Sequence, residues 1–290
     1  MTDWGYRAAA VLARRLPLPW SDFLANATAD LYVLTHPRPA RAVNRRLRAL
    51  RESRPRDAAA PFDARSTYRA FARAVRDFLR GPTRDGETPT VTVDPGTRAI
   101  LDRARADGVP TLVLSGHFGP WEVALGWLAR EVGPLEALAA PHPRRSIQRF
   151  FAGRRAASGV GTLSGDSAAM RALAALRDGR WLAALADRAC SPRHRLAGLA
   201  GCVPIDRAPL LLARRAGARI LAGVSWRGDD GAIHVRFLEP FTLAPGREGL
   251  SLAQGASRLQ RFFDDHIRAH PTQWYEWAAG ASGGGSAGPR

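Results

Sequence analysis

The sequence predicts an α/β fold in which a mostly parallel mixed sheet is flanked by helices and preceded by an N-terminal helical segment. Two patterns support this fold class. From residue 90 onward, short apolar runs alternate with longer segments of helical periodicity, as in parallel sheets with crossover helices. Residues 227–231, Arg-Gly-Asp-Asp-Gly, form a hairpin signal late in the chain, so part of the sheet is expected to be antiparallel.

The chain divides into three expected segments. Residues 1–82 read as a helical segment that associates with a membrane, residues 83–278 as the α/β core, and residues 279–290 as a disordered Gly/Ser-rich tail. We treat the first two as one integrated domain, because 290 residues suit a single large core. The predicted strands cover 90–93, 111–115, 135–139, 181–186, 220–226 and 233–237. The predicted helices of the core cover 96–106, 121–131, 145–157, 167–178, 207–216 and 251–269.

The amino-acid composition indicates which classes of molecule the protein is expected to bind. The net charge is +17, and all 43 basic residues are arginines, because the chain contains no lysine. Arginine binds phosphate bidentately and stays charged, which suits anionic lipids, nucleotide-bearing thioesters and acidic carrier proteins. Nucleic acid is not expected, because the arginines are spread along the chain and no recognisable nucleic-acid module is present. Cys190 and Cys202 indicate neither a disulfide framework nor a metal site.

The N-terminal residues 3–18 alternate apolar and arginine positions. This pattern fits a helix that lies on an anionic membrane, and it fits equally a helix packed on the core. No apolar run reaches the length of a transmembrane helix, and no signal peptide is apparent. We therefore expect a peripheral protein on the cytoplasmic face of the cell membrane.

The stretch Ser115-Gly116-His117-Phe118-Gly119-Pro120-Trp121-Glu122 follows the apolar run 111–114. An imidazole with a carboxylate partner can remove a proton from a hydroxyl. His117 and Glu122 are five positions apart, so on one helix they would diverge by about 140°. They can meet only if the chain turns between them, which the two glycines permit, and Pro120 suits a helix start. The alternative is a surface histidine followed by an unrelated glutamate.

Residues 116–122 resemble the H-x4-D/E motif of the glycerolipid acyltransferases. More narrowly, they resemble the branch with the bacterial lipid A biosynthesis (late) acyltransferases and the phosphatidylinositol mannoside acyltransferases. Further similarities follow in the same order: the arginine-bearing segment 149–155, the Leu-Ala-Asp of residues 185–187, the segment 201–217, and the Pro-x-Gln-Trp of residues 271–274. Arg188 departs from the family pattern, which often has glutamine after the Leu-Ala-Asp.

The resemblance implies a glycerol-3-phosphate-acyltransferase-like fold and an O-acyltransferase of the class that transfers groups other than aminoacyl groups. The donor would be acyl-CoA or an acyl carrier protein, and the acceptor a hydroxyl of a membrane glycolipid or lysolipid. His117 would act as general base with Glu122 fixing its tautomer, and N–H groups near Gly119 would hold the oxyanion. No covalent acyl-enzyme, metal or cofactor is expected, and we expect a monomer.

Arg155 and Asp187 are further candidates for substrate binding, together with Gly119 and Trp121. Arg155 is expected to bind a phosphate or to pair with Asp187, with a buried ion pair as the structural alternative. Trp121, Leu125, Trp127 and Leu128 are candidates for lining an acyl tunnel, although core packing is favoured for them. His266 and His270 are expected on a surface helix face rather than at a metal. The competing functions are acylation of a soluble hydroxyl or amine, and a non-catalytic nucleic-acid binder.

Overall fold

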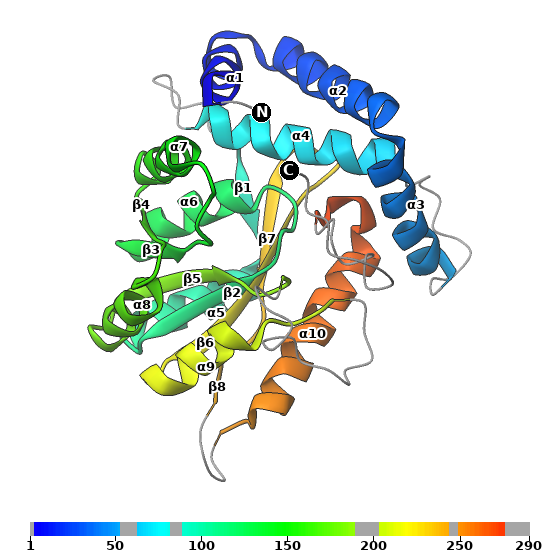
Figure 1. Cartoon of the computed structure of the whole chain (residues 1–290). Helices are drawn as coiled ribbons and strands as arrows, with labels where there is room; N and C mark the ends of the chain where they lie inside the picture. The colour runs from blue at the N-terminus through cyan, green and yellow to red at the C-terminus, as the bar shows by residue number, and fades with distance from the viewer. Residues whose placement is uncertain (1–2, 53–62, 82–88, 189–202, 244–248, 276–290) are drawn as a thin grey trace.

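The computed structural model describes residues 3–52, 63–81, 89–188, 203–243 and 249–275. Its N-terminal part is helical, which confirms the prediction for residues 1–82 where the structure describes them. The four helices are α1 (Asp3–Arg15), α2 (Leu18–Thr35), α3 (Pro37–Glu52) and α4 (Ala64–Arg80). In Figure 1, α1, α2 and α4 form a layer at one end of the molecule, and α3 continues it along one side.

The strands in the rest of the described chain form one eight-stranded mixed sheet. Their order is β1-β7-β6-β2-β5-β3-β4, with β8 paired to β6. All pairs are parallel except β6 with β7 and β6 with β8, which are antiparallel. The predicted α/β class with a late antiparallel region is therefore confirmed. The strands are β1 (Val91–Val93), β2 (Thr111–Ser115), β3 (Leu135–Leu138), β4 (Val160–Leu163), β5 (Trp181–Leu185), β6 (Arg219–Arg227), β7 (Ile233–Phe237) and β8 (Phe241–Thr242).

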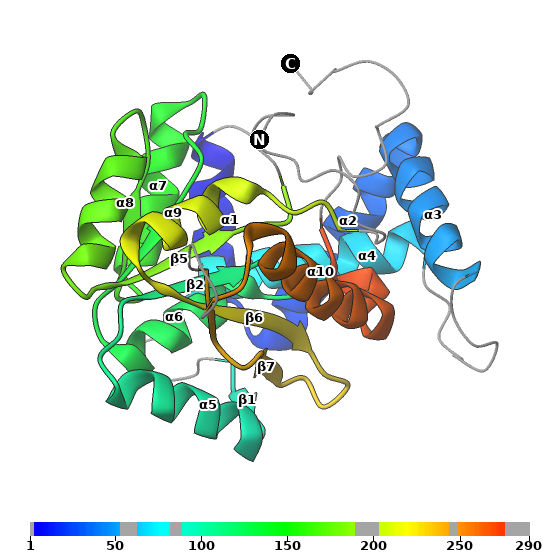
Figure 2. The ribbon, with the colours of Figure 1, turned by 90° about the horizontal axis from the view of Figure 1, so that it is seen from below.

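Helices cover both faces of the sheet. One face carries α5 (Pro95–Ala106) and α6 (Trp121–Val132), and the opposite face carries α8 (Ala168–Arg177), α9 (Arg207–Ala216) and α10 (Leu252–Ala269) (Figure 2). The helix α7 (Arg145–Ala156) lies near the β3–β4 edge, and the short 3-10 helix η2 (Pro271–Gln273) follows α10 (Figure 1).

Local sequence explains where several of these helices begin. Asp94 and Asp206 accept hydrogen bonds from the first-turn N–H groups of α5 and α9, which is the preferred N-cap arrangement. Ser251 and Gln254 form a reciprocal capping box at the start of α10. These caps lie at or next to the predicted helix starts, so the boundaries of these helices were readable from the sequence.

The alternation of side chains along β2 divides the core into two halves. Leu112 and Leu114 are fully buried against the α8, α9 and α10 side, whereas Val113 packs on the α6 side. The parallel strands β2 and β5 are paired in register up to Ser115 and Leu185, so their carboxyl ends lie together. In open α/β sheets, ligands bind at this edge.

Two expectations differ from the structure. The strands β4 and β8 were not predicted, because each is short and gains its hydrogen bonds from a neighbouring strand rather than from a strong local pattern. His266 does not lie on an exposed helix face: it is buried between Phe118 and Trp226. The expected tail at residues 279–290 and both cysteines lie outside the described residues.

Candidate active site

The loop between β2 and α6 depends on two glycines. A Cβ at Gly116 would lie 2.5 Å from the Phe118 ring and 3.0 Å from the Asp187 carboxyl carbon. Gly119 has φ +50°, and a Cβ there would lie 2.5 Å from the backbone oxygen of Ser225. The chain therefore turns sharply against β6, as the glycines predicted. Pro120 caps α6 rather than occupying its first turn, which begins at Trp121.

His117 is held by Asp187, which lies two residues after β5 ends at Leu185. The imidazole Nδ1 lies 2.9 Å from Asp187 Oδ1, and the His117 backbone N–H donates to Asp187 Oδ2 at 2.9 Å. Because a carboxylate only accepts, Nδ1 carries the proton and Nε2 is left as the basic nitrogen. The His117 side chain is 22% exposed, whereas that of Asp187 is fully buried. This arrangement fixes the imidazole in the lining of the adjacent cavity.

The ionised form of Asp187 is stabilised despite its burial. Burial by itself raises the pKa of this carboxyl group. The charge and the two N–H groups of His117, together with the Trp274 indole N–H, outweigh that effect and hold the pKa of Asp187 below its usual value. Asp187 is therefore a carboxylate near neutral pH, as a partner for an imidazolium must be.

Glu122 does not take the place expected for it beside His117. It pairs with Arg155 of α7, whose Nε and Nη2 donate to its two carboxylate oxygens at 2.9 and 2.5 Å. Glu122 sits in the first turn of α6 and faces α7, whereas the loop turns His117 toward the end of β5. The expected contact between His117 and Glu122 is thus replaced by two pairs, and Arg155 does not pair with Asp187.

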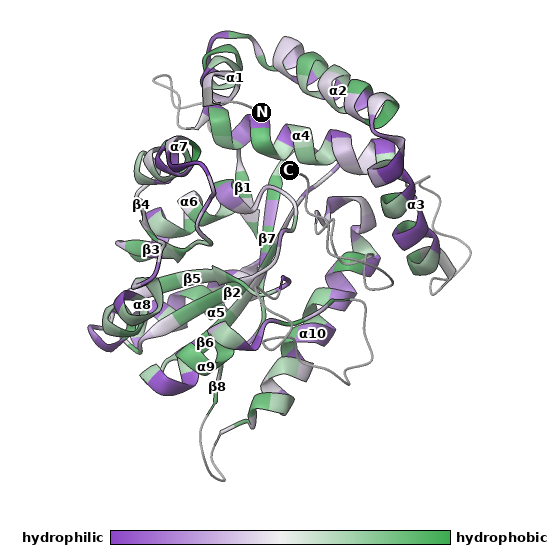
Figure 3. Ribbon diagram, viewed as in Figure 1, coloured by the Kyte–Doolittle hydropathy of each residue, from purple (hydrophilic) through white to green (hydrophobic). Residues whose placement is uncertain are grey.

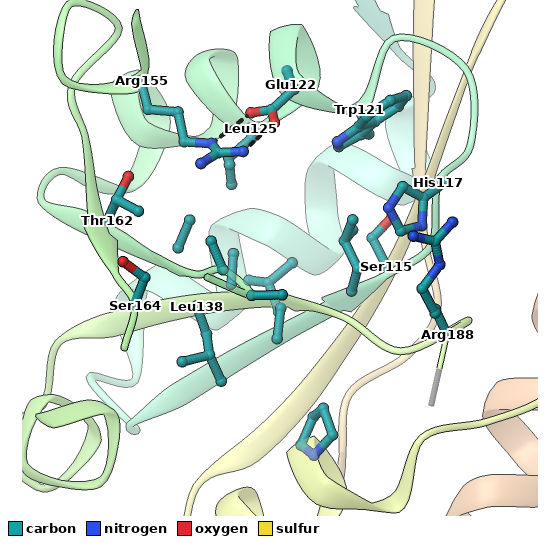
Figure 4. A pocket seen from close by; sticks show the side chains of 18 of the residues that line it. Ser115, His117, Trp121, Glu122, Leu125, Leu138, Arg155, Thr162, Ser164 and Arg188 are labelled. Atoms are coloured by element: carbon teal, nitrogen blue, oxygen red, sulfur yellow. Dashed lines mark hydrogen bonds and ion pairs between the residues drawn. The ribbon is translucent and has the colours of Figure 1, made fainter. Parts of the chain in front are cut away.

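The Glu122–Arg155 pair is largely buried, with side chains 11% and 18% exposed. Burial opposes the charged guanidinium, but the two hydrogen bonds and the charge of Glu122 leave the pKa of Arg155 above its usual value. The pair joins α6 to α7 above the cavity (Figure 4). It therefore places a fixed, internally compensated ion pair in the cavity wall.

A cavity of about 800 Å³ opens beside His117. Figure 4 places His117, Ser115 and Arg188 at one side, the Glu122–Arg155 pair above, and Thr162 and Ser164 at the far wall. Beneath α6 the lining is mostly apolar. This part of the cavity, here called the apolar arm, is lined by Val113, Ala124, Leu125, Trp127, Leu128, Ala137, Ala183, Gly223, Val235 and Phe237.

The small side chains beneath α6 create this space. Ala137, Ala183 and Val113 stand side by side on β3, β5 and β2, because these strands are paired in register at those residues. Trp127 and Phe237, which both line the arm, stack with ring centroids 6.5 Å apart. All four residues considered for an acyl tunnel, Trp121, Leu125, Trp127 and Leu128, line the cavity, although Trp127 and Leu128 also belong to the buried core.

The predicted site residues fall into two groups. His117, Trp121, Glu122 and Arg155 line the cavity, as does Arg188. Asp187 and Gly119 do not line the cavity but lie next to residues that do. The Gly119 N–H donates to the backbone oxygen of Gln273 at 2.7 Å, so this group is not available to an oxyanion.

The segment after η2 is the part of the site that the sequence did not reveal. Trp274 Nε1 donates to Asp187 Oδ2 at 3.0 Å, across 87 positions of the chain. The similarity of residues 271–274 to the family's C-terminal signature marked this segment without suggesting a role. No local pattern encodes a contact of such long range.

The described residues contain no group of three or more His, Cys, Asp and Glu side chains able to hold a metal ion. Among the helices of the described residues, none has both the length and the apolar character needed to cross a membrane.

Comparison with known protein families identifies the family of the chain. The family model for bacterial lipid A biosynthesis acyltransferases matches residues 1–277, which is nearly the whole chain. No curated protein matches the chain. Members of this family use an acyl donor and a lipid acceptor, so the chain is an acyltransferase of lipid biosynthesis. The protein belongs to the bacterial lipid A biosynthesis acyltransferase family.

Proposed function

We propose that the protein moves a fatty acyl group from an acyl thioester to a hydroxyl of a membrane glycolipid or lysolipid, with His117 as general base. The observation that carries this proposal is the His117–Asp187 hydrogen bond at the mouth of the apolar arm. It leaves Nε2 as the basic nitrogen beside a space suited to a hydrocarbon chain.

The transfer needs one proton carrier. His117 Nε2 takes the proton of the acceptor hydroxyl as its oxygen attacks the thioester carbonyl carbon. Asp187 stabilises the imidazolium that forms, as the carboxylate does in a catalytic triad. The new C–O bond remains when the C–S bond breaks, and the imidazolium returns its proton to the leaving thiolate. The donor is acyl-CoA or an acyl carrier protein, and no acyl-enzyme is required.

Glu122 acts in this scheme through Arg155 rather than through His117. Their two hydrogen bonds fix the start of α6 against α7 and leave a guanidinium face beside the cavity. We propose that this cation and that of Arg188 hold anionic groups of the substrates. The oxyanion of the intermediate is assigned to the N–H groups of Trp121 and Glu122 at the start of α6, since those of Gly119 and Val123 donate to the backbone oxygens of Gln273 and Pro120.

An anionic membrane surface is the partner that fits the N-terminal helices. The outward side of α2 exposes Trp20, Phe23, Leu31 and Leu34 by 61–79%, while its small residue Ala29 is buried. The two acidic residues of α2 do not oppose an anionic surface, because they pair with arginines of α4: Asp22 with Arg76, and Asp30 with Arg65 and Arg69.

Arginines flank this apolar side. Arg7, Arg14 and Arg15 of α1 are exposed, and Figure 3 shows α3 as a strongly hydrophilic helix. On α1 the structure supports both sequence-based interpretations: Tyr6 packs against Phe151, whereas Trp4 is 78% exposed. Large apolar side chains ringed by cations are typical of interfacial membrane binding.

The test is an acyl-transfer assay with wild-type protein, His117→Ala and His234→Ala, using acyl-CoA and acyl carrier protein donors. The acceptors are a lysophospholipid in anionic vesicles and a soluble glycoside. We expect transfer to the vesicle lipid to fall about 100- to 10,000-fold in His117→Ala. His234 is a matched control, because it is partly exposed and does not line the cavity. Undiminished transfer by His117→Ala would overturn the mechanism, and transfer to the glycoside alone would overturn the lipid acceptor.

A further inference from the structure

The residues after η2 run alongside the loop that carries His117. The Gly119 N–H donates to the Gln273 oxygen at 2.7 Å, and the Tyr275 N–H donates to the His117 oxygen at 2.9 Å. Phe118 and Trp274 form an antiparallel bridge between these two bonds. Residues 273–275 therefore act as a short strand that fixes the loop backbone from His117 to Gly119.

Trp274 adds a side-chain contact to this bridge. Its indole is 1% exposed, and Nε1–H donates to Asp187 Oδ2 at 3.0 Å. The same oxygen accepts the His117 backbone N–H, while Oδ1 receives the imidazole Nδ1. Three donors from two residues thus hold one buried carboxylate. Charge-assisted hydrogen bonds of this kind are stronger and more directional than neutral ones.

Arg46 of α3 holds Trp274 from the other side. Its guanidinium carbon lies 4.7 Å from the centre of the indole ring, and Nη2 donates to the Trp274 backbone oxygen at 2.9 Å. The ring is therefore fixed by a cation–π contact and its backbone by a hydrogen bond. A continuous chain of contacts runs from α3 through Trp274 and Asp187 to the imidazole.

We infer that Trp274 is a positioning residue for His117, acting through Asp187, and that Arg46 keeps Trp274 in place. The indole N–H limits the rotation of the carboxylate, so that Oδ1 stays aimed at Nδ1 and Nε2 stays aimed at the cavity. This inference rests on the proposed role of His117 as the base. Loss of the indole N–H should reduce the rate of the chemical step more than substrate binding, because Trp274 does not line the cavity.

The experiment compares Trp274→Phe with Trp181→Phe, in the full chain. The first change removes the indole N–H and keeps an aromatic ring. The second makes the same substitution at the opposite end of β5, away from Asp187. We expect kcat for acyl transfer to vesicle lipid to fall about 10-fold or more in Trp274→Phe, with KM within about twofold. The control should keep its kcat.

A spectroscopic readout separates this inference from the function itself. In protein labelled with 15N-histidine, the Nδ1–H resonance of His117, assigned by its loss in His117→Ala, should be sharp and far downfield in the wild type. It should broaden in Trp274→Phe and stay unchanged in Trp181→Phe. A sharp, unshifted resonance together with an unaltered kcat would overturn the inference. If the wild type shows no transfer, the resonance still decides it, and the proposed function fails alone.

A second pair of variants covers the case in which Trp274→Phe does not fold. Arg46→Gln removes the guanidinium above the indole, and Arg45→Gln makes the same change at an exposed neighbour on α3. The same broadening and a kcat loss of about three- to tenfold are expected in Arg46→Gln only. Equal effects of both changes would point to α3 as a whole and would also overturn the inference.

Discussion

Asp187 holds His117 at two points, through the backbone N–H and through the imidazole Nδ1, each at 2.9 Å. A single contact would leave the ring free to rotate about its side-chain bonds. The double contact fixes the loop and the ring together, which is the preorganisation that a general base needs. The partner of His117 therefore comes from the segment after β5, and not from the helix that follows His117 in the sequence.

Asp187→Asn should impair the chemical step strongly. An amide keeps one acceptor oxygen but turns an N–H₂ group toward at least one of the three donors, and it no longer offsets the imidazolium charge. We expect kcat to fall by about two to four orders of magnitude with a small change in KM. Steady-state kinetics with varied acceptor will check this, and circular dichroism will confirm that the variant folds. A loss confined to KM would contradict the assignment.

Glu122→Gln should act differently, through stability. It leaves the Arg155 guanidinium without a carboxylate partner in a pocket where that side chain is only 18% exposed. Breaking a buried ion pair on one side costs about 3–5 kcal/mol, whereas replacing both partners costs less. Thermal unfolding of Glu122→Gln, Arg155→Met and the double variant will test this as a double-mutant cycle. Additive losses in the double variant would show that the two residues are not coupled.

The same pair shows what could be predicted from the sequence. The turn between His117 and Glu122 was readable, because glycines and a helix start have local signatures. The partners of these residues were not, since Asp187, Arg155 and Trp274 come from distant segments. Sheet order decides which strand ends lie together, and β5 is next to β2 although two other strands separate them in the sequence. The family resemblance indicated the segments that contain these residues, but it did not indicate which residues contact one another.

The strands illustrate the same limit. Those in the centre of the sheet have continuous apolar runs that mark them clearly, such as Thr111–Ser115. The edge strand Val160–Leu163 contains a glycine and a threonine and gains its regular hydrogen bonds only from β3. The cavity was equally hidden, because alanines at 137 and 183 read as ordinary core residues until the register of β3 and β5 places them together.

The alanines beneath α6 should set the length of acyl chain that the apolar arm accepts. Ala183 lies in the floor of that arm, so Ala183→Leu should fill part of it. We expect a shift of preference toward donors about two to four carbons shorter, since one buried CH₂ contributes about 0.8 kcal/mol. A competition assay with acyl-CoA donors of increasing length will measure it. Unchanged preference, with an unchanged melting temperature, would place the acyl chain elsewhere.

Removal of a large lining side chain should have the opposite effect. Trp127 and Phe237 stack in the lining of the apolar arm, so Trp127→Leu should enlarge the space available to the chain. Longer donors should then gain relative to shorter ones in the same competition assay. The variant will be less stable, because replacing a buried tryptophan by a smaller residue leaves a cavity. The comparison therefore uses the ratio of products within one reaction, which does not depend on the amount of folded enzyme.

His266 should make the fold sensitive to acid. Burial is the main reason that its pKa is lowered well below the ordinary value, and the positive charges of His270 and Arg236 lower it further. The unfolded chain therefore binds a proton near pH 6.5 that the folded chain does not. Stability contributed by neutral His266 is present above that pH and is lost as the pH falls below it, by up to about 1.4 kcal/mol per pH unit.

The same His266 effect can be isolated with one variant and one control. His266→Phe keeps a ring against Phe118 and removes the proton acceptor, so it should flatten the decline of stability between about pH 6.5 and 5. His142→Phe alters an exposed histidine and should leave that slope unchanged. Urea unfolding at several pH values gives the slope directly. A wild-type decline that persists unaltered in His266→Phe would assign the acid sensitivity between about pH 6.5 and 5 to other groups. Asp187 is not one of them, because its lowered pKa makes the folded state lose stability only below about pH 5.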